Sequence, residues 1–151
     1  MKLQNKLPKG ITGIAGEYFV AGELSRRGFM ASITLRNNDS IDIHASKDCG
    51  NKIFAIQVKT NQNGGRSWPL NKKSELLKAK NLFYIFVSLK GLTERPEYFI
   101  VPSEYIAERM KSGHAKWLAK LGKKGQPHND TNMRQFQDKN GDYLEKWELF
   151  Y

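Results

Sequence analysis

Apolar and polar residues alternate in two segments of the first half of the chain, residues 41–45 and 53–60. A period of two is typical of a β-strand that buries one face and exposes the other. The residues between them, 47–51, are rich in turn-forming types, so the two strands are predicted to form an antiparallel hairpin. Side chains two positions apart then share a face, and Gln57 and Lys59 are such a pair.

The segment from about residue 11 to residue 27 has the 3.6-residue period of an amphipathic helix. Glu17 falls within its apolar stripe, whereas Glu23 falls on the opposite side, which we expect to be solvated. A carboxylate on a buried face is costly unless it is paired or binds a cation. Glu17 is therefore a candidate site residue. The stripe itself consists of Ile14, Tyr18, Ala21, Leu24 and Ser25.

Further elements follow from the same pattern. They are an edge strand at 29–35, a short basic helix at 72–80, a central strand buried on both faces at 81–89, a strand at 97–101 and a helix at 103–111 with Ser103 as its N-cap. The predicted fold class is therefore α/β, with a mixed β-sheet of about five strands flanked by helices. Residues from Tyr143 onward are again apolar, so we expect them to dock onto the fold or onto a second subunit.

The length of 151 residues predicts one compact domain. We expect residues 1–112 to form the core and residues 113–151 to form a basic C-terminal extension that packs on it. No apolar run is long enough to cross a bilayer, and no signal-peptide core follows the first residues. The single cysteine, Cys49, excludes an intramolecular disulfide, and no Cys/His cluster has zinc-site spacing. A soluble, cytoplasmic protein is expected.

The formal net charge of +10 favours a polyanionic partner, because Lys and Arg contacts to phosphates supply most non-specific affinity for nucleic acid. A membrane surface is the competing polyanion, and we expect DNA instead. The basic, glycine-broken segment at 111–139 is a candidate to follow a phosphate backbone, although such tails also serve only to solubilise. In the loop at 61–68, Trp68 is expected to pack on the core. The candidate nucleic-acid contacts are Arg66, Lys72, Lys73, Lys116, Lys120, Lys123 and Lys124.

Three short motifs follow one another along the chain. They are Gly16-Glu17 in the first helix, Ser40-Ile41-Asp42 at the first hairpin strand and Gln57-Val58-Lys59-Thr60 in the second. This order resembles the PD-(D/E)xK nuclease superfamily, which includes restriction endonucleases, archaeal Holliday-junction resolvases and a small group of homing endonucleases. The resemblance covers roughly the first half of the chain. Two positions depart from the motif, since Ile41 replaces Pro and Gln57 replaces Asp or Glu.

The resemblance implies a restriction-endonuclease-like fold and a metal-dependent endonuclease that hydrolyses DNA, with a homodimer as the expected assembly. It also implies a Mg²⁺ site, with Mn²⁺ as a substitute, in which Asp42 is the central ligand. Gln57 would give its side-chain carbonyl oxygen, Val58 its backbone carbonyl and Glu17 its carboxylate, directly or through water. Lys59 would stabilise the charge that develops on the phosphate in the transition state.

Each of these residues also has an interpretation without catalysis, since a strand-end Asp often closes a turn and alternating polar residues often face solvent. A non-catalytic nucleic-acid-binding relative of the same fold is therefore an alternative. A protein-interaction or accessory factor that uses its basic tail on an acidic partner is another. The nuclease requires Glu17, Asp42 and Lys59 to converge, whereas the alternatives do not. The sequence leaves open whether the substrate is DNA or RNA.

Overall fold

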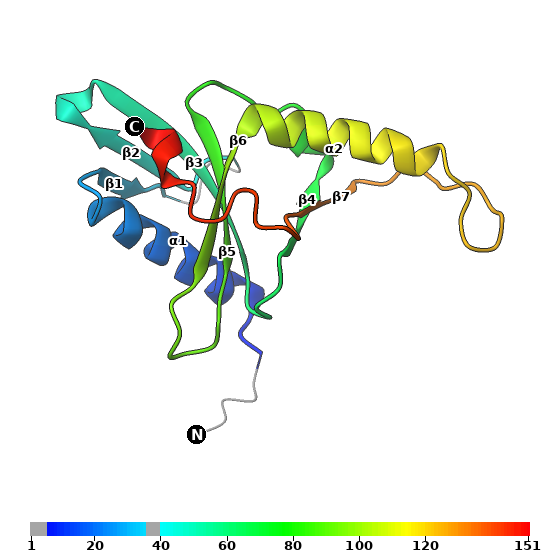
Figure 1. The fold of residues 1–151 in the computed structure, drawn as a ribbon, viewed down its shortest axis with the longest axis horizontal. Coiled ribbons are helices and arrows are strands. Elements are labelled where there is room, and N and C mark those ends of the chain that lie inside the picture. The colour runs from blue at the N-terminus through cyan, green and yellow to red at the C-terminus, as the bar shows by residue number, and fades with distance from the viewer. Residues whose placement is uncertain (1–5, 36–39) are drawn as a thin grey trace.

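A five-stranded mixed sheet forms the centre of the computed structural model, which describes residues 6–35 and 40–151, and a two-stranded ribbon lies beside it (Figure 1). The helices are α1 (Lys9–Ser25) and α2 (Ser103–Leu118), with 3-10 turns η1 (Asp48–Gly50), η2 (Lys72–Glu75) and η3 (Trp147–Phe150). The strands are β1 (Met30–Ile33), β2 (Ile43–Lys47), β3 (Lys52–Asn61), β4 (Ser67–Asn71), β5 (Leu82–Ser88), β6 (Glu97–Pro102) and β7 (Met133–Gln137). Within the described ranges, no helix combines the length and the apolar character that a membrane span requires.

The strand order of the sheet is β1-β2-β3-β5-β6. β2 and β3 form the predicted antiparallel hairpin, which ends where Ile43 pairs with Ile56. β3 and β5 are parallel, and β6 returns antiparallel to β5. The predicted α/β class with a mixed sheet of about five strands is therefore confirmed.

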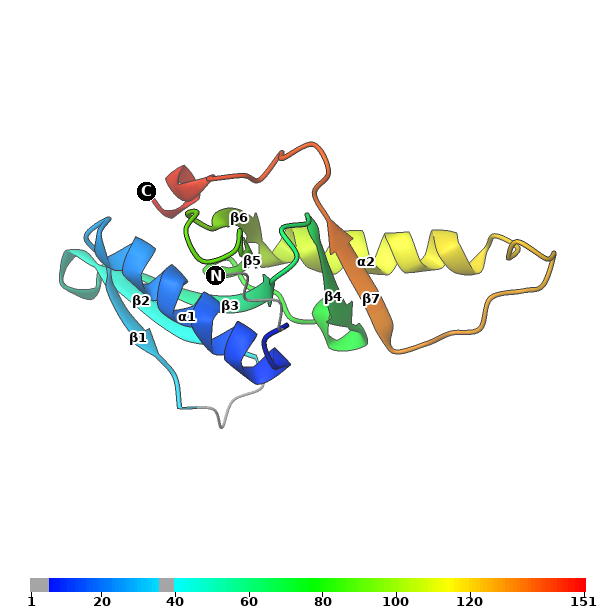
Figure 2. The same ribbon diagram turned by 90° about the horizontal axis from the view of Figure 1, so that it is seen from below.

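The alternation of side chains in β5 divides the core into two clusters, one on each face of the sheet. Ile85 belongs to the cluster that contains Val20 of α1, and Phe86 belongs to the cluster that contains Ile106 of α2. All residues of β5 are buried, as predicted for a central strand. The two helices consequently cover opposite faces of the sheet (Figures 1 and 2).

The ribbon of β4 and β7 packs on the α2 face of the sheet. Trp68 of β4 pairs with Phe136 of β7, and both are buried in the α2-side cluster. The indole Nε1 of Trp68 donates to the Val87 carbonyl at 2.9 Å, so the expected packing of Trp68 on the core is confirmed. Neither strand was predicted, because each is only five residues long, β7 is largely polar and Pro69 interrupts the β4 pattern.

The C-terminal segment is an integral part of the fold. α2 is continuous across residues 112 and 113, so the expected domain boundary does not coincide with a break in the structure. β7 completes the ribbon, and Trp147 and Phe150 are buried in the cluster on the α1 face. The apolar end of the chain therefore docks on its own fold.

Two predicted helices differ from the structure at their ends. Ser103 is the first residue of α2 and not its N-cap, because its Oγ donates to the Ala79 carbonyl and accepts from the Ala79 N–H, both at 3.0 Å. Ala79 is thus hydrogen-bonded to the start of α2. The predicted basic helix at 72–80 is only the turn η2, while α2 extends past residue 111 to Leu118.

α1 buries a different face from the predicted one. Tyr18 is 67% exposed, whereas Glu23, expected in solvent, is only 7% exposed. The buried residues of α1 are Thr12, Gly16, Val20, Glu23 and Leu24. The hydrophobic period of the helix could not reveal which face is buried, because the burial of Glu23 depends on charged partners outside α1.

Glu23 lies at the centre of an ion-pair network that ties α1 to the C-terminal segment. Arg27 and Arg95 both bind its carboxylate, with Arg95 Nη2 at 3.2 Å, and Arg95 Nη1 also binds Glu145 at 2.7 Å. Burial raises the pKa of Glu23, but hydrogen bonds from Arg95 and Arg27 outweigh burial, so the pKa lies below its ordinary value. The charged form of Glu23 is therefore stabilised by folding.

α1 approaches β3 at a contact that a larger residue could not make. A Cβ added to Gly16 would lie 1.8 Å from Thr60 Oγ1 and 2.9 Å from Thr60 Cβ. Thr60 Oγ1 is buried there and has no hydrogen-bond partner among the described residues. The contact places the next residue, Glu17, beside the strand that carries Gln57 and Lys59.

Substitution Glu23→Gln is expected to lower the free energy of unfolding by about 1–3 kcal/mol at pH 7, because it removes the charge that pairs with Arg26, Arg27 and Arg95. Since the pKa of Glu23 is lower in the folded state, this stabilisation is complete above the unfolded pKa of 4.5 and is lost as the pH falls through the folded pKa. Urea unfolding of both proteins from pH 7 to pH 3 would measure it. Glu148→Gln, at a side chain that is 64% exposed, is the control and should change stability little. A difference that stays constant down to pH 3 would contradict the linkage.

Substitution Gly16→Ala is expected to destabilise the fold by about 1–3 kcal/mol, because the new methyl group forces α1 away from Thr60. Gly13→Ala in the same helix is the matched control. Its Cβ would meet nothing within 4 Å, so alanine should leave stability unchanged or raise it by up to about 1 kcal/mol through helix propensity. Thermal and urea unfolding measure both variants. Thr60→Ala should restore part of the stability of Gly16→Ala, and equal effects at the two glycines would exclude the steric explanation.

Candidate functional site

Asp42 lies immediately before β2 and binds the middle of β3. Its Oδ2 accepts a hydrogen bond from Gln57 Nε2 at 2.6 Å and one from the Val58 N–H at 2.7 Å. The last residue pair of the hairpin ladder is Ile43 with Ile56, so Asp42 lies just outside the ladder. Its N–H still donates to the Ile56 carbonyl at 2.9 Å. The sequence motifs around Asp42 and Gln57 are therefore in direct contact.

The backbone of Val58 faces the same place. The N–H and the carbonyl of one strand residue point to the same side of the strand. Because the Val58 N–H donates to Asp42, the Val58 carbonyl is also directed toward the Asp42 side of β3. Its side chain, in contrast, is buried in the cluster on the α1 face.

Lys59 is attracted electrostatically by both carboxylates of the motifs, Asp42 and Glu17. Gln57 and Lys59 project from the face of β3 opposite to that covered by α1, since Ile56 and Val58 occupy the α1 face. Burial lowers the pKa of Lys59, and electrostatic attraction from Asp42 and Glu17 opposes this without cancelling it. Glu17, half-buried on α1, thus lies close enough to Lys59 to stabilise its ammonium.

A cavity of about 300 Å³ opens on the side of β3 that carries Gln57 and Lys59 and is called the site cavity below. Its lining includes Gln57 and Lys59 from β3, Ser40 from the segment before Asp42, Lys73 from η2 and Tyr84 from β5. Burial raises the pKa of the Tyr84 phenol to about 12, and the negative charge of Asp42 adds to this effect. Tyr84 therefore remains protonated at neutral pH. A strand of the ribbon, β4, closes the cavity with Pro69, Leu70 and Asn71.

Sequence reasoning did not identify Tyr84 as a site residue. It lies within an unbroken apolar run, and its pairing with Gln57 in the parallel ladder is long-range. A tyrosine in an apolar strand is usually a core residue. The signal that could have found it was the polar hydroxyl on the face shared with Gln57, once the strand order was known.

The donor set fits a divalent metal through mixed oxygen ligands. Among the residues that the structure describes, no group of three or more His, Cys, Asp and Glu side chains is placed to hold a metal ion. The Asp42 carboxylate and the Val58 carbonyl directed toward it are two such oxygens, and the Gln57 amide, which turns its Nε2 to Asp42, carries a third on its other arm. Hard cations such as Mg²⁺ accept such oxygens and keep several waters.

The basic residues predicted from the sequence to contact nucleic acid lie in four different settings. Lys73 lines the site cavity. Arg66 is engaged within the fold, where its Nη2 lies 3.5 Å from Glu97 Oε1 and its guanidinium lies over the Phe99 ring. Lys72 pairs with Asp130 at 3.3 Å. The others are exposed at the far end of α2 and in the loop after it, and they are Lys116, Lys120, Lys123 and Lys124.

The overall structure is similar to that of the bacterial homing endonuclease I-Ssp6803I, with a TM-score of 0.55 and 13% sequence identity over 95% of this chain and 91% of that one. Hjc, a Holliday junction resolvase from the archaeal hyperthermophile Archaeoglobus fulgidus, aligns with a TM-score of 0.46 and 14% identity over 83% of this chain and 84% of that one. No protein-family model matches the chain, and no curated protein sequence matches it.

A likeness at 13% identity concerns the fold and not the activity. The alignment nevertheless extends over nearly the whole of both chains, including the sheet that carries Asp42, Gln57 and Lys59. The fold that the motifs implied is thus confirmed independently of them. The chain has the restriction-endonuclease-like fold.

Proposed function

We propose that this chain is a metal-dependent endonuclease that hydrolyses phosphodiester bonds of DNA. The observation that carries the proposal is that Gln57 and Lys59 line one cavity, that Asp42 is hydrogen-bonded to Gln57, and that Asp42 and Glu17 both attract the Lys59 ammonium. This is the convergence that a nuclease requires and that a binding or interaction protein does not. The similarity in fold to a homing endonuclease supports the same function.

The residues around Asp42 would hold a Mg²⁺ ion, for which Mn²⁺ can substitute. Such an ion neutralises phosphate oxygens and acidifies a bound water. Asp42 supplies the main charge, Glu17 a second one directly or through water, and the Val58 carbonyl a neutral oxygen. Gln57 now directs its Nε2 at Asp42, and rotation of its amide would present Oε1 to the ion.

Lys59 would act on the phosphate. Its lowered pKa reflects burial, which also makes its charge more effective because little water screens it. Asp42 and Glu17 favour the charged form, so the ammonium is available to stabilise the charge that develops in the transition state. Lys73 on the wall of the site cavity is placed to contact a neighbouring phosphate.

The net charge of +10 supports a nucleic-acid substrate. We propose duplex DNA in the cytoplasm as the substrate, and a homodimer as the active assembly, because each site cuts one strand and two sites cut both. The basic residues at the end of α2 would extend the contact with the DNA backbone beyond the site cavity.

A non-catalytic DNA-binding protein of the same fold is the second candidate. One observation favours it, since the Gln57 amide and the Val58 N–H already satisfy an oxygen of Asp42 without any cation. Such a protein would bind DNA in a salt-sensitive manner and would not cleave it.

Purified protein is expected to nick supercoiled plasmid with Mg²⁺ or Mn²⁺ and to lose this activity with a chelator. Asp42→Ala removes the central charge and Lys59→Ala removes the transition-state cation, so each should lower the rate by roughly a hundredfold or more. Gel analysis of nicked and linear plasmid measures the rates. Lys52→Ala, an exposed lysine on the same strand, is the matched control and should retain activity. Cleavage that survives both site substitutions would exclude this site, and salt-sensitive binding without cleavage would identify the second candidate.

Substitution Gln57→Glu tests the metal site directly. A second carboxylate beside Asp42 should strengthen Mg²⁺ binding, so the Mg²⁺ concentration for half-maximal cleavage should fall by about tenfold. Without metal, the lost hydrogen bond and the repulsion between two carboxylates should destabilise the fold by about 1–2 kcal/mol. Thermal unfolding with and without Mg²⁺ gives a readout independent of activity, with Gln126→Glu in the loop after α2 as the control. A Mg²⁺ response identical to that of the wild type would show that residue 57 does not contact the ion.

A further inference from the structure

The β4–β7 ribbon presents a polar outer face that the packing of the fold does not use. Trp68, Leu70, Arg134 and Phe136 are buried beneath the ribbon. The alternate positions point away from the core, and they are Ser67, Pro69, Asn71, Met133, Gln135 and Gln137. None of these six residues is charged, and several carry hydrogen-bonding groups.

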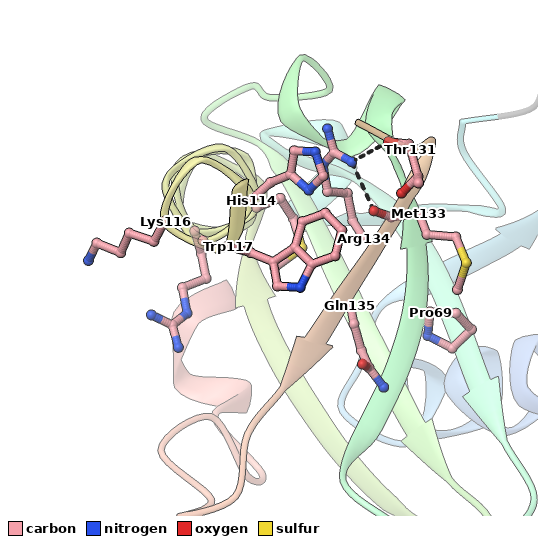
Figure 3. A pocket seen from close by; sticks show the side chains of 11 residues that line it. Pro69, His114, Lys116, Trp117, Thr131, Met133, Arg134 and Gln135 are labelled. Atoms are coloured by element: carbon pink, nitrogen blue, oxygen red, sulfur yellow. Dashed lines mark hydrogen bonds between the residues drawn. The ribbon is translucent and has the colours of Figure 1, made fainter. Parts of the chain in front are cut away.

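A groove of about 630 Å³ runs between the ribbon and α2, and Pro69, Met133 and Gln135 of the outer face belong to its lining. Figure 3 shows Trp117 and His114 of α2 beside β7, with Met133 and Gln135 on β7 and Pro69 on β4. Trp117 stacks on the His128 ring at 4.0 Å between centroids, so it forms a fixed wall. The other side chains on this wall include the exposed cations Arg109 and Lys116, and no carboxylate lines the groove among the described residues.

We propose that the outer face of the ribbon enters the major groove of duplex DNA and reads base edges through Gln135 and Gln137, while Arg109 and Lys116 contact the phosphate backbone beside it. This inference rests on the proposed function, because it names duplex DNA as the ligand and gives the nuclease a sequence preference. Arg109 and Lys116 on the wall of the groove complement the phosphates, and the uncharged amide of Gln135 in its lining suits a base edge. Gln137 is the next outward-facing position on β7, beyond the groove.

The dimensions of the ribbon match the double helix. A two-stranded antiparallel ribbon fits the major groove, which is about 12 Å wide. Side chains two positions apart on a strand are separated by about 6.8 Å, which is about twice the 3.4 Å rise per base pair. Gln135 and Gln137 would therefore address base pairs two steps apart.

The side chain of Gln135 is already oriented. Its Nε2 donates to Ser67 Oγ of the neighbouring strand at 2.6 Å. A glutamine amide has a second N–H and a carbonyl oxygen, and this combination pairs with N7 and N6 of adenine. Holding the amide in advance reduces the entropy lost on binding.

The ribbon is also connected to the site cavity. Pro69 belongs to both linings, and Leu70 and Asn71 of the same strand line the site cavity with Gln57 and Lys59. DNA bound along the outer face therefore continues toward the candidate catalytic groups. Base recognition and cleavage would then take place on adjacent surfaces joined by β4.

The test is selection from a pool of duplexes with a randomised 20-base-pair core, bound by the wild-type protein in chelator and sequenced. A preferred motif is expected. Gln135→Ala should reduce discrimination at one or two adjacent positions by about tenfold, and Gln137→Ala should do so two base pairs away. Lys116→Ala should weaken binding to all sequences alike and lower the salt dependence. Asn51→Ala, an exposed amide at the hairpin turn, is the matched control and should leave the motif unchanged.

Three outcomes would overturn the inference: no enriched motif, a motif that both glutamine variants keep, or an equal loss with Asn51→Ala. Sedimentation of the wild type and of a Gln135→Ala/Gln137→Ala variant adds a further check, because weaker self-association of the variant together with an unchanged motif would assign the face to a second copy of the chain. The proposed function is tested separately by plasmid nicking. Cleavage without these effects refutes only base reading by the ribbon, whereas an altered motif without cleavage refutes only the nuclease.

Discussion

The Asp42 carboxylate joins the end of one strand to the middle of the next, and the geometry of the site depends on this contact. The β2–β3 ladder stops at Ile43 and Ile56. At the next step Asp42 replaces a backbone partner with its side chain, which accepts from the Val58 N–H and the Gln57 amide. The Asp42 side chain thus continues the hydrogen bonding between β2 and β3 where their backbones no longer pair. It also places a carboxylate beside Gln57, which lines the site cavity.

Alternate side chains of β3 serve two purposes: one set packs in the core and the other lines the candidate site. Ile56 and Val58 enter the cluster covered by α1, while Gln57 and Lys59 enter the site cavity. The core side fixes the strand, and the fixed strand positions the polar side. A charged lysine is tolerated at this depth because two carboxylates oppose the cost of its burial.

Much of this arrangement could be predicted from local patterns. The period of two identified the β2–β3 hairpin, and the unbroken apolar run identified β5, because both signals are contained within a few residues. The ribbon could not be predicted, since β4 and β7 are short and far apart in the chain, and Pro69 interrupts the pattern of β4. Glu23 was misplaced for a related reason: its burial depends on Arg95, which no helical period can reveal. The motif residues were found because their spacing is local, whereas Tyr84 joins them only through the parallel ladder.

The closure of the α1-side cluster by the C-terminal segment has a consequence for how the chain folds. The Tyr151 hydroxyl donates to the Arg27 carbonyl across 124 residues, and the Phe29 and Phe150 rings meet at 5.9 Å. Contacts at such separations close large loops, so they form late and slow the folding reaction. During synthesis, the apolar side chains of α1 and of β1 to β3 that pack against Trp147 and Phe150 remain uncovered until η3 has been synthesised. Apolar surface that is uncovered in an incomplete chain favours aggregation, so the last residues of the fold also protect the first ones.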